Sequence, residues 1–199
     1  MSEKKERWIL AAVLPLIVIL LLAVWGAKPR TDEMIIETSA NGFWDLSETG
    51  IRQKAVRLTG AVEYVADALL TPQEFSERPD IHVGQPGSET QYATSRMHLT
   101  VPQGSYLICG YSVDFASRMY VNGELIFEAG IPGNSRETTT PGVKFYLLPV
   151  SPDANGELVI VQQAANFTHK DGGTYGSFFI GPPEPVSYTH LRAHETGAY

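Results

Sequence analysis

A polar loop near the carboxy end of the chain holds the densest group of side chains that could do chemistry. Asn166, His169, Asp171 and Tyr175 fall within ten residues, on a segment with two adjacent glycines. An amide, an imidazole, a carboxylate and a phenol can all make hydrogen bonds. Turn chemistry also explains part of the pattern, because Asp171-Gly172-Gly173 is an ordinary turn sequence and Asn166 can cap a strand end. A ligand role for these residues therefore depends on the fold that positions them.

Catalytic chemistry is not predicted from any group in the chain. Glu63, Asp67 and Glu74 could suggest the paired carboxylates of glycoside hydrolysis, but they occupy unrelated local contexts and an acidic surface is expected here. The sequence contains neither a nucleophile-elbow motif nor a phosphate-binding loop. We therefore predict no catalytic residue and no enzyme activity in this segment.

No metal or cofactor is predicted either. His82 and His98 fall on strand-like runs, where solvated side chains are the simpler interpretation, and no histidine or carboxylate cluster has the spacing of metal ligands. Cys109 is the only cysteine, which excludes an internal disulfide and a cysteine-based metal cage. We expect Cys109 to be a small core residue, as free cysteines usually are.

The charge of the chain argues against nucleic acid as a partner. Between residues 31 and 186 there are 9 Lys and Arg against 19 Asp and Glu. A body this acidic repels a phosphate backbone.

The amino-terminal sequence predicts a membrane anchor. A basic start, residues 1–7, precedes the run from Trp8 to Ala27, which is twenty residues long and uncharged. As a helix it would measure about 30 Å, the thickness of the hydrocarbon core of a bilayer. A cleaved signal peptide is the alternative, although the apolar run exceeds the usual 7 to 15 residues and lacks an A-x-A site. Both interpretations place the rest of the chain outside the cytoplasm, attached to the cell membrane in the first.

Beyond a linker at residues 28–41, the body at residues 42–186 reads as an all-β domain. The clearest element is Arg118–Gly130, where Asn122-Gly123 lies between two apolar runs, the signature of a type I′ β-hairpin. Residues 92–101 alternate between apolar and polar side chains, as a half-buried strand does. Short strands about ten residues apart, separated by Gly and Pro turns, are typical of a β-sandwich or barrel.

Further elements follow from local patterns. The segment 106–115 is expected to be a separate strand with Leu107 and Cys109 on its apolar face, joined to the preceding strand by a hairpin loop at Pro102-Gln103-Gly104. Pro72 excludes a strand at residues 69–75, so a turn or a single helical turn is expected there. Residues 81–83, 143–148, 157–163 and 177–180 complete the predicted strands.

The last thirteen residues, 187–199, match nothing before them. They closely resemble the translated read-through of a sequencing adapter, so we exclude them from the interpretation of fold and site. The expectation is that the natural protein continues past Val186.

The body resembles the extracellular jelly-roll sensor domain of bacterial seven-transmembrane receptors with diverse intracellular signalling modules, a relative of galactose-binding-like domains. Five sequence pieces carry the resemblance in order. They are Leu58–Val65, Leu69–Phe75, Gln91–Leu99, Arg118–Gly130 and the stretch from Gln162 to Gly181.

The resemblance implies a galactose-binding-like β-sandwich outside the membrane. It further implies a histidine kinase or cyclase output domain, which this sequence lacks, and a possible homodimer in the full-length receptor. It also implies a small ligand such as a carbohydrate at the end loops, which makes Asn166, His169, Asp171 and Tyr175 the candidate ligand-binding residues. Two alternatives stay open: the amino-terminal accessory jelly roll of a surface glycoside hydrolase, and a structural adhesion module.

Overall fold

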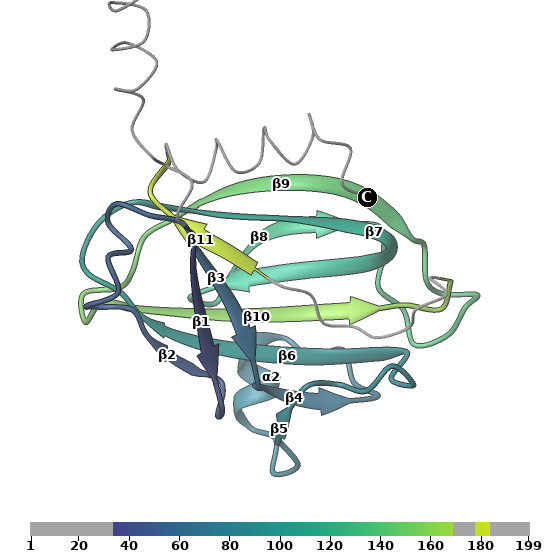
Figure 1. The fold of residues 1–199 in the computed structure, drawn as a ribbon. Helices are drawn as coiled ribbons and strands as arrows, with labels where there is room; N and C mark the ends of the chain where they lie inside the picture. The colour runs from purple at the N-terminus through teal and green to yellow at the C-terminus, as the bar shows by residue number, and fades with distance from the viewer. Residues whose placement is uncertain (1–33, 169–177, 184–199) are drawn as a thin grey trace, which may run out of the picture. The chain divides into compact units, whose positions relative to one another are not determined.

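The computed structural model describes residues 34–168 and 178–183, and the chain in these ranges is almost entirely β-structure (Figure 1). The elements are β1 (Ile35–Ser39), β2 (Phe43–Asp45), β3 (Val56–Gly60), β4 (Val62–Ala66), α2 (Pro72–Ser76), β5 (His82–Gly84), β6 (Tyr92–Thr100), β7 (Tyr106–Val121), β8 (Glu124–Ala129), β9 (Gly142–Val150), β10 (Glu157–Ala165) and β11 (Phe178–Gly181). The predicted all-β class is confirmed.

Three predictions concern residues outside these ranges: the anchor at 8–27, the tail at 187–199, and the ligand residues His169, Asp171 and Tyr175. Within the described ranges, none of the helical structure has the length and apolar character needed to cross a bilayer.

The hairpin predicted at residues 118–130 is present. β7 ends at Val121 and β8 begins at Glu124, and the two intervening residues have positive φ angles, 49° at Asn122 and 86° at Gly123. The type I′ turn needs both angles, which is why Asn-Gly is favoured. The register between the two strands shifts once, between Met119 and Tyr120. Such a bulge was not visible in the sequence pattern.

The strands form a curled sheet whose two parts share β7. One part, sheet A, contains β1, β3, β11, the first part of β7, and β9. The other, sheet B, contains β2, β4, β5, β6, β10, the last part of β7, and β8. The chain crosses between the two parts within one strand, so the apolar faces of both turn toward a common core.

Two expectations about this region were wrong. Residues 106–115 are not a separate strand but the first part of the sixteen-residue β7. Pro102-Gln103-Gly104 does not close a hairpin, because β10 lies between β6 and β7 and pairs with both. Sequence spacing suggested a local pairing, whereas β10 supplies the partner from about sixty residues further along the chain.

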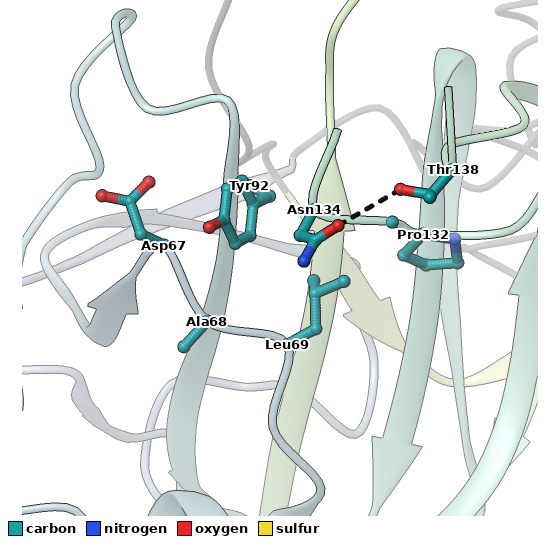
Figure 2. Close-up of a pocket in the computed structure, with 8 residues that line it drawn as sticks. Asp67, Ala68, Leu69, Tyr92, Pro132, Asn134 and Thr138 are labelled. Carbon is teal, nitrogen blue, oxygen red and sulfur yellow. Dashed lines mark hydrogen bonds between the residues drawn. The ribbon is translucent and has the colours of Figure 1, made fainter. Parts of the chain in front are cut away.

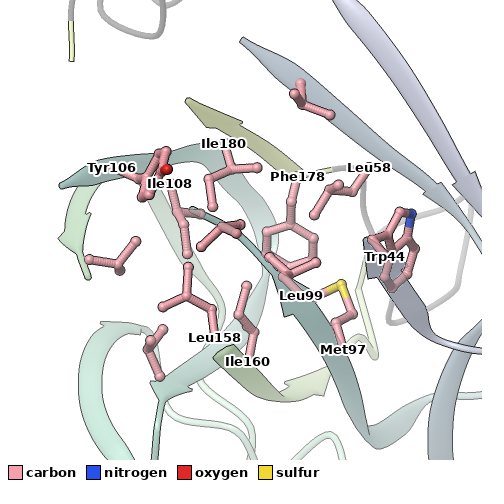
Figure 3. Packing of buried hydrophobic residues seen from close by; sticks show 14 of the residues in the cluster. Trp44, Leu58, Met97, Leu99, Tyr106, Ile108, Leu158, Ile160, Phe178 and Ile180 are labelled. Carbon is pink, nitrogen blue, oxygen red and sulfur yellow. The ribbon is translucent and has the colours of Figure 1, made fainter. Parts of the chain in front are cut away.

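The core lies between the two parts of the curled sheet and draws on both (Figure 3). Phe178 and Ile180 of β11 enter it from sheet A, and Met97 and Leu99 of β6 enter from sheet B; each is at most 2% exposed. Trp44 of β2 also packs in this core and is 4% exposed. Burial of side chains of this size stabilises the fold by roughly 2 kcal/mol each.

The predicted inward face of residues 106–110 was also wrong. Tyr106 and Ile108 are the core residues of this segment, while Leu107 and Cys109 face outward and form a small second cluster with Ala55 and Phe179. Both faces of this strand carry apolar side chains, so alternation could not select the inward one. Cys109 is nevertheless buried, as predicted, and burial raises the pKa of its thiol to about 11.

The short helix α2 covers the outer face of sheet B. Thr71 caps it, and Glu74 completes a capping box by accepting from the Thr71 backbone N–H at 2.8 Å. Phe75 is fully buried under the guanidinium of Arg96, 4.8 Å from the ring centroid. Arg96 also pairs with Glu63, with 2.6 Å between its Nε and the carboxylate. Glu63 and Glu74 therefore both make structural interactions, Glu63 with Arg96 and Glu74 with the Thr71 cap.

Candidate ligand-binding pocket

A pocket of about 420 Å³ opens where several loops meet at one end of the sheet (Figure 2). Its walls come from the segment after β4, the start of β6, and the β8–β9 loop. The lining residues are Asp67, Ala68, Leu69, Tyr92, Pro132, Gly133, Asn134 and Thr138. The volume lies within the range of about 300 to 1,000 Å³ that is usual for small-molecule sites. These described residues place an aromatic ring, a carboxylate, an amide and a hydroxyl around it.

Two buried polar side chains of the underlying sheet hold the backbone of the segment after β4, which forms one wall of the pocket. The Thr94 hydroxyl accepts from the Leu70 backbone N–H at 2.8 Å and donates to the Ala68 carbonyl at 2.9 Å. Gln163 of β10 donates from Nε2 to the Leu70 carbonyl, also at 2.9 Å. Asp67 starts this segment in the left-handed region, with φ 53°, a conformation that aspartate tolerates better than most residues. The sheet thus holds this side of the pocket in place before any ligand arrives.

Replacing Thr94 by valine is expected to lower the free energy of unfolding by about 2 kcal/mol, because the Leu70 N–H and the Ala68 carbonyl lose a buried partner. Urea unfolding of the full chain measures the change. Thr94→Ser is the matched control, since it keeps the hydroxyl and should lose far less. An equal loss in the serine and valine variants would mean that the methyl group, and not the hydrogen bonds, matters.

The opposite wall is the loop between β8 and β9. An isolated bridge between Ile131 and Thr140 closes it at the base, with N–H to carbonyl distances of 2.8 and 2.9 Å. Thr138 donates from its hydroxyl to Oδ1 of Asn134 at 3.3 Å, which orients the Asn134 amide beside the pocket (Figure 2). A side chain at Gly133 would meet the backbone of Thr138, so the loop requires glycine there.

The structure places Asn166 at the same end of the sheet. It is 6% exposed, and its backbone N–H donates to the Gln91 carbonyl at 2.6 Å, which joins the end of β10 to the residue before Tyr92. The next residue, Phe167, stacks on the Tyr92 ring at 6.1 Å between centroids, and its carbonyl accepts from Arg136 at 2.7 Å. Of the four predicted ligand residues, Asn166 is the one within the described ranges. It lies beside the pocket without lining it.

The remaining polar candidates lie elsewhere. His82 is exposed and contacts Tyr64, and the His98 ring stacks on Phe43 at 4.4 Å. Burial lowers the pKa of His98 and the charge of Arg96 acts in the same direction, whereas Glu63 acts against both. In the part of the chain that the structure describes, no three His, Cys, Asp or Glu side chains gather in a group that could hold a metal ion.

Sequence reasoning missed most of this pocket. The sequence marks Asp67 only as a carboxylate in an unrelated context, and it indicates no ligand role for Tyr92, Asn134 or Thr138. The length of the β8–β9 loop was one available signal, since loops of about twelve residues or more are often functional.

Fold and pocket together define a β-sandwich-like domain with a polar and aromatic pocket at its loop end. No family model matches the sequence, and no curated protein matches it.

Similar solved structures come from glycosidases. A GH2 β-galacturonidase from Eisenbergiella tayi, bound to galacturonate, is 10% identical with a TM-score of 0.43, over 65% of this chain and 24% of its own. A β-glucuronidase from Faecalibacterium prausnitzii is 13% identical with a TM-score of 0.42, over 65% of this chain and 32% of its own. A β-glucosidase from Kluyveromyces marxianus is 13% identical with a TM-score of 0.38, over 71% and 18%. The chain thus spans less than a third of each enzyme.

Proposed function

We propose that the chain is a non-catalytic, galactose-binding-like jelly-roll domain that binds a small neutral carbohydrate outside the cytoplasm. The pocket at the loop end carries this proposal. Tyr92 offers an aromatic ring against which the C–H face of a sugar can lie, and Asp67, Asn134 and Thr138 offer acceptors and donors for its hydroxyls. A neutral sugar is favoured over a uronate because Asp67 would repel a ligand carboxylate.

Two features support a binding role over a catalytic one. Among the described residues that line the pocket, Asp67 is the single carboxylate, whereas glycoside hydrolysis generally uses two carboxyl groups facing each other across the substrate. The other two carboxylates considered from the sequence, Glu63 and Glu74, are engaged with Arg96 and Thr71.

Removing the aromatic ring tests the proposal. In titrations of the full chain in detergent micelles with D-galactose, D-glucose and N-acetylglucosamine, we expect at least one sugar to bind with a millimolar Kd. Tyr92→Ala should weaken that binding at least tenfold, which is about 1.4 kcal/mol. Tyr120→Ala is the matched control, since it removes a half-buried tyrosine near the hairpin turn, outside the pocket.

Two outcomes would contradict the proposal. The first is the absence of binding by all three sugars at millimolar concentrations. The second is equal weakening by Tyr92→Ala and Tyr120→Ala, which would indicate a general loss of structure. Stronger binding of D-glucuronate than of D-galactose would overturn the preference for a neutral ligand and leave the pocket itself intact.

Two kinds of full-length protein are candidates to contain this domain. In the first, the apolar segment at residues 8–27 anchors the domain in the cell membrane, and ligand binding shifts the equilibrium of a sensor whose kinase or cyclase lies beyond residue 186. In the second, the domain is an accessory module of a surface glycoside hydrolase; the similar solved structures are glycosidases. Sequencing the gene past the codon for Val186 separates them: further membrane segments with a signalling domain support the sensor, and a catalytic barrel supports the hydrolase.

A further inference from the structure

The outer face of sheet A carries a row of five paired residues across five strands, four of them apolar and the fifth, Arg57, charged. Cys109 within the row is only 5% exposed, so the exposed apolar side chains lie toward the two edges. Pairing aligns Leu147 of β9, Cys109 of β7, Phe179 of β11, Arg57 of β3 and Ile36 of β1. Paired residues point to the same side of a sheet, and the sequence neighbours of this row, such as Ile108 and Ile180, point into the core. The row therefore lies on the side of sheet A away from the core.

The edges of this face are strongly exposed. Val143 is 67% exposed and Leu147 37% on β9, and Ile36 on the other edge strand is 58% exposed. Among the described outward side chains of these strands, Arg57 is the one that carries a charge, and that charge is positive. Exposed apolar side chains gathered on one face are a common sign of a contact surface, and here they lie on a body with about twice as many acidic as basic residues.

The short segment between the amino-terminal apolar run and β1 indicates that the partner of this surface is a lipid bilayer. β1, an edge strand of this sheet, begins at Ile35, and the uncharged run of twenty residues ends at Ala27. The seven residues between them reach at most about 25 Å when fully extended. If the run lies in a bilayer, sheet A is tethered to the bilayer surface by its own edge strand. The face also lacks negative charge among its described outward side chains, so anionic headgroups would not repel it.

We propose that the outer face of sheet A docks on the lipid bilayer surface. Ile36, Val143 and Leu147 enter the boundary between headgroups and acyl chains, as the apolar side of an interfacial segment does. The pocket, with walls built from the β4–α2 and β8–β9 loops, stays accessible to soluble ligand. This inference rests on the membrane-anchored form of the proposed function.

Quenching by brominated lipids tests the contact. The full chain carries Cys109→Ala and one new cysteine bearing an environment-sensitive fluorophore, at Ile36→Cys or Val143→Cys. It is reconstituted in vesicles of phosphatidylcholine and phosphatidylglycerol with brominated acyl chains. We expect quenching of both labels by at least twofold. A label at Gln73→Cys, on α2 over the outer face of sheet B, is the matched control and should stay unquenched.

A second variant tests whether the apolar side chains cause the contact. Leu147→Asp places a charge on an exposed position of the face, where the fold should tolerate it. Quenching of the Ile36 label should then fall by at least half. Unchanged quenching would overturn the proposal, because the anchor alone would account for it.

The remaining outcomes separate this inference from the proposed function. A chain that fails to float with the vesicles contradicts the anchor and hence the sensor. A chain that floats while the labels at residues 36 and 143 remain unquenched contradicts the docking alone. Energy transfer between two labelled copies without lipid quenching assigns the face to a second copy of this chain and also overturns the docking.

Discussion

Phe178→Ala is expected to lower the free energy of unfolding by about 4 kcal/mol, one of the two largest effects predicted for this domain. Phe178 is 2% exposed and packs in the core from β11, a strand of four residues that joins β3 to β7. Its loss leaves a cavity between the two parts of the curled sheet and weakens the strand that closes sheet A.

The adjacent residue provides the control. Phe179 is half-buried and points to the outer face of sheet A, so Phe179→Ala should cost only about 1 kcal/mol. Urea unfolding of both variants measures the difference. Equal destabilisation would contradict the assignment of inner and outer faces to β11, and with it the outer, mostly apolar row.

Gly130→Ala is expected to destabilise the domain by about 3 kcal/mol and to remove sugar binding at the pocket. Gly130 has φ 68° at the start of the β8–β9 loop, and a Cβ atom there would collide with the Thr140 carbonyl oxygen and approach the Gly142 nitrogen to 2.8 Å. The bridge between Ile131 and Thr140 would have to open, and Asn134 and Thr138 would move away from the pocket.

Gly123→Ala is the matched control for this substitution. Its φ is also positive, 86°, but an added Cβ has no atom within 4 Å. Backbone strain alone should then cost about 1 kcal/mol, with sugar binding unchanged. Thermal unfolding and sugar titration on the two variants are the measurements. Retained binding in Gly130→Ala would show that the β8–β9 loop does not shape the site.

The pocket and the outer face of sheet A are formed by different parts of the domain. The pocket is lined by the segment after β4, the start of β6 and the β8–β9 loop, whereas the outer, mostly apolar row runs across β9, β7, β11, β3 and β1. β7 pairs with strands of both parts of the sheet, so the two parts are joined by one continuous strand.

Local sequence determined the class of the fold and most of its elements. Asn122-Gly123 fixed the hairpin because few other dipeptides adopt two positive φ angles, and alternation from Ala93 to Val101 fixed β6 and its inward face. Pro72 correctly excluded a strand where α2 forms. Such features depend on the conformational preferences of adjacent residues, which the sequence displays directly.

Tertiary structure alone decided strand pairing, face selection and the pocket. β10 lies between β6 and β7 because packing and hydrogen bonding join strands far apart in sequence, and no local pattern encodes that choice. Both faces of β7 near Ile108 are apolar, so only the position of the core selects the inward one. Asp67, Tyr92 and Asn134 come from three separate segments and meet only when the sheet has formed. The sequence indicated the kinds of side chain that a ligand would need, and the long-range pairing of strands decided which of them share a site.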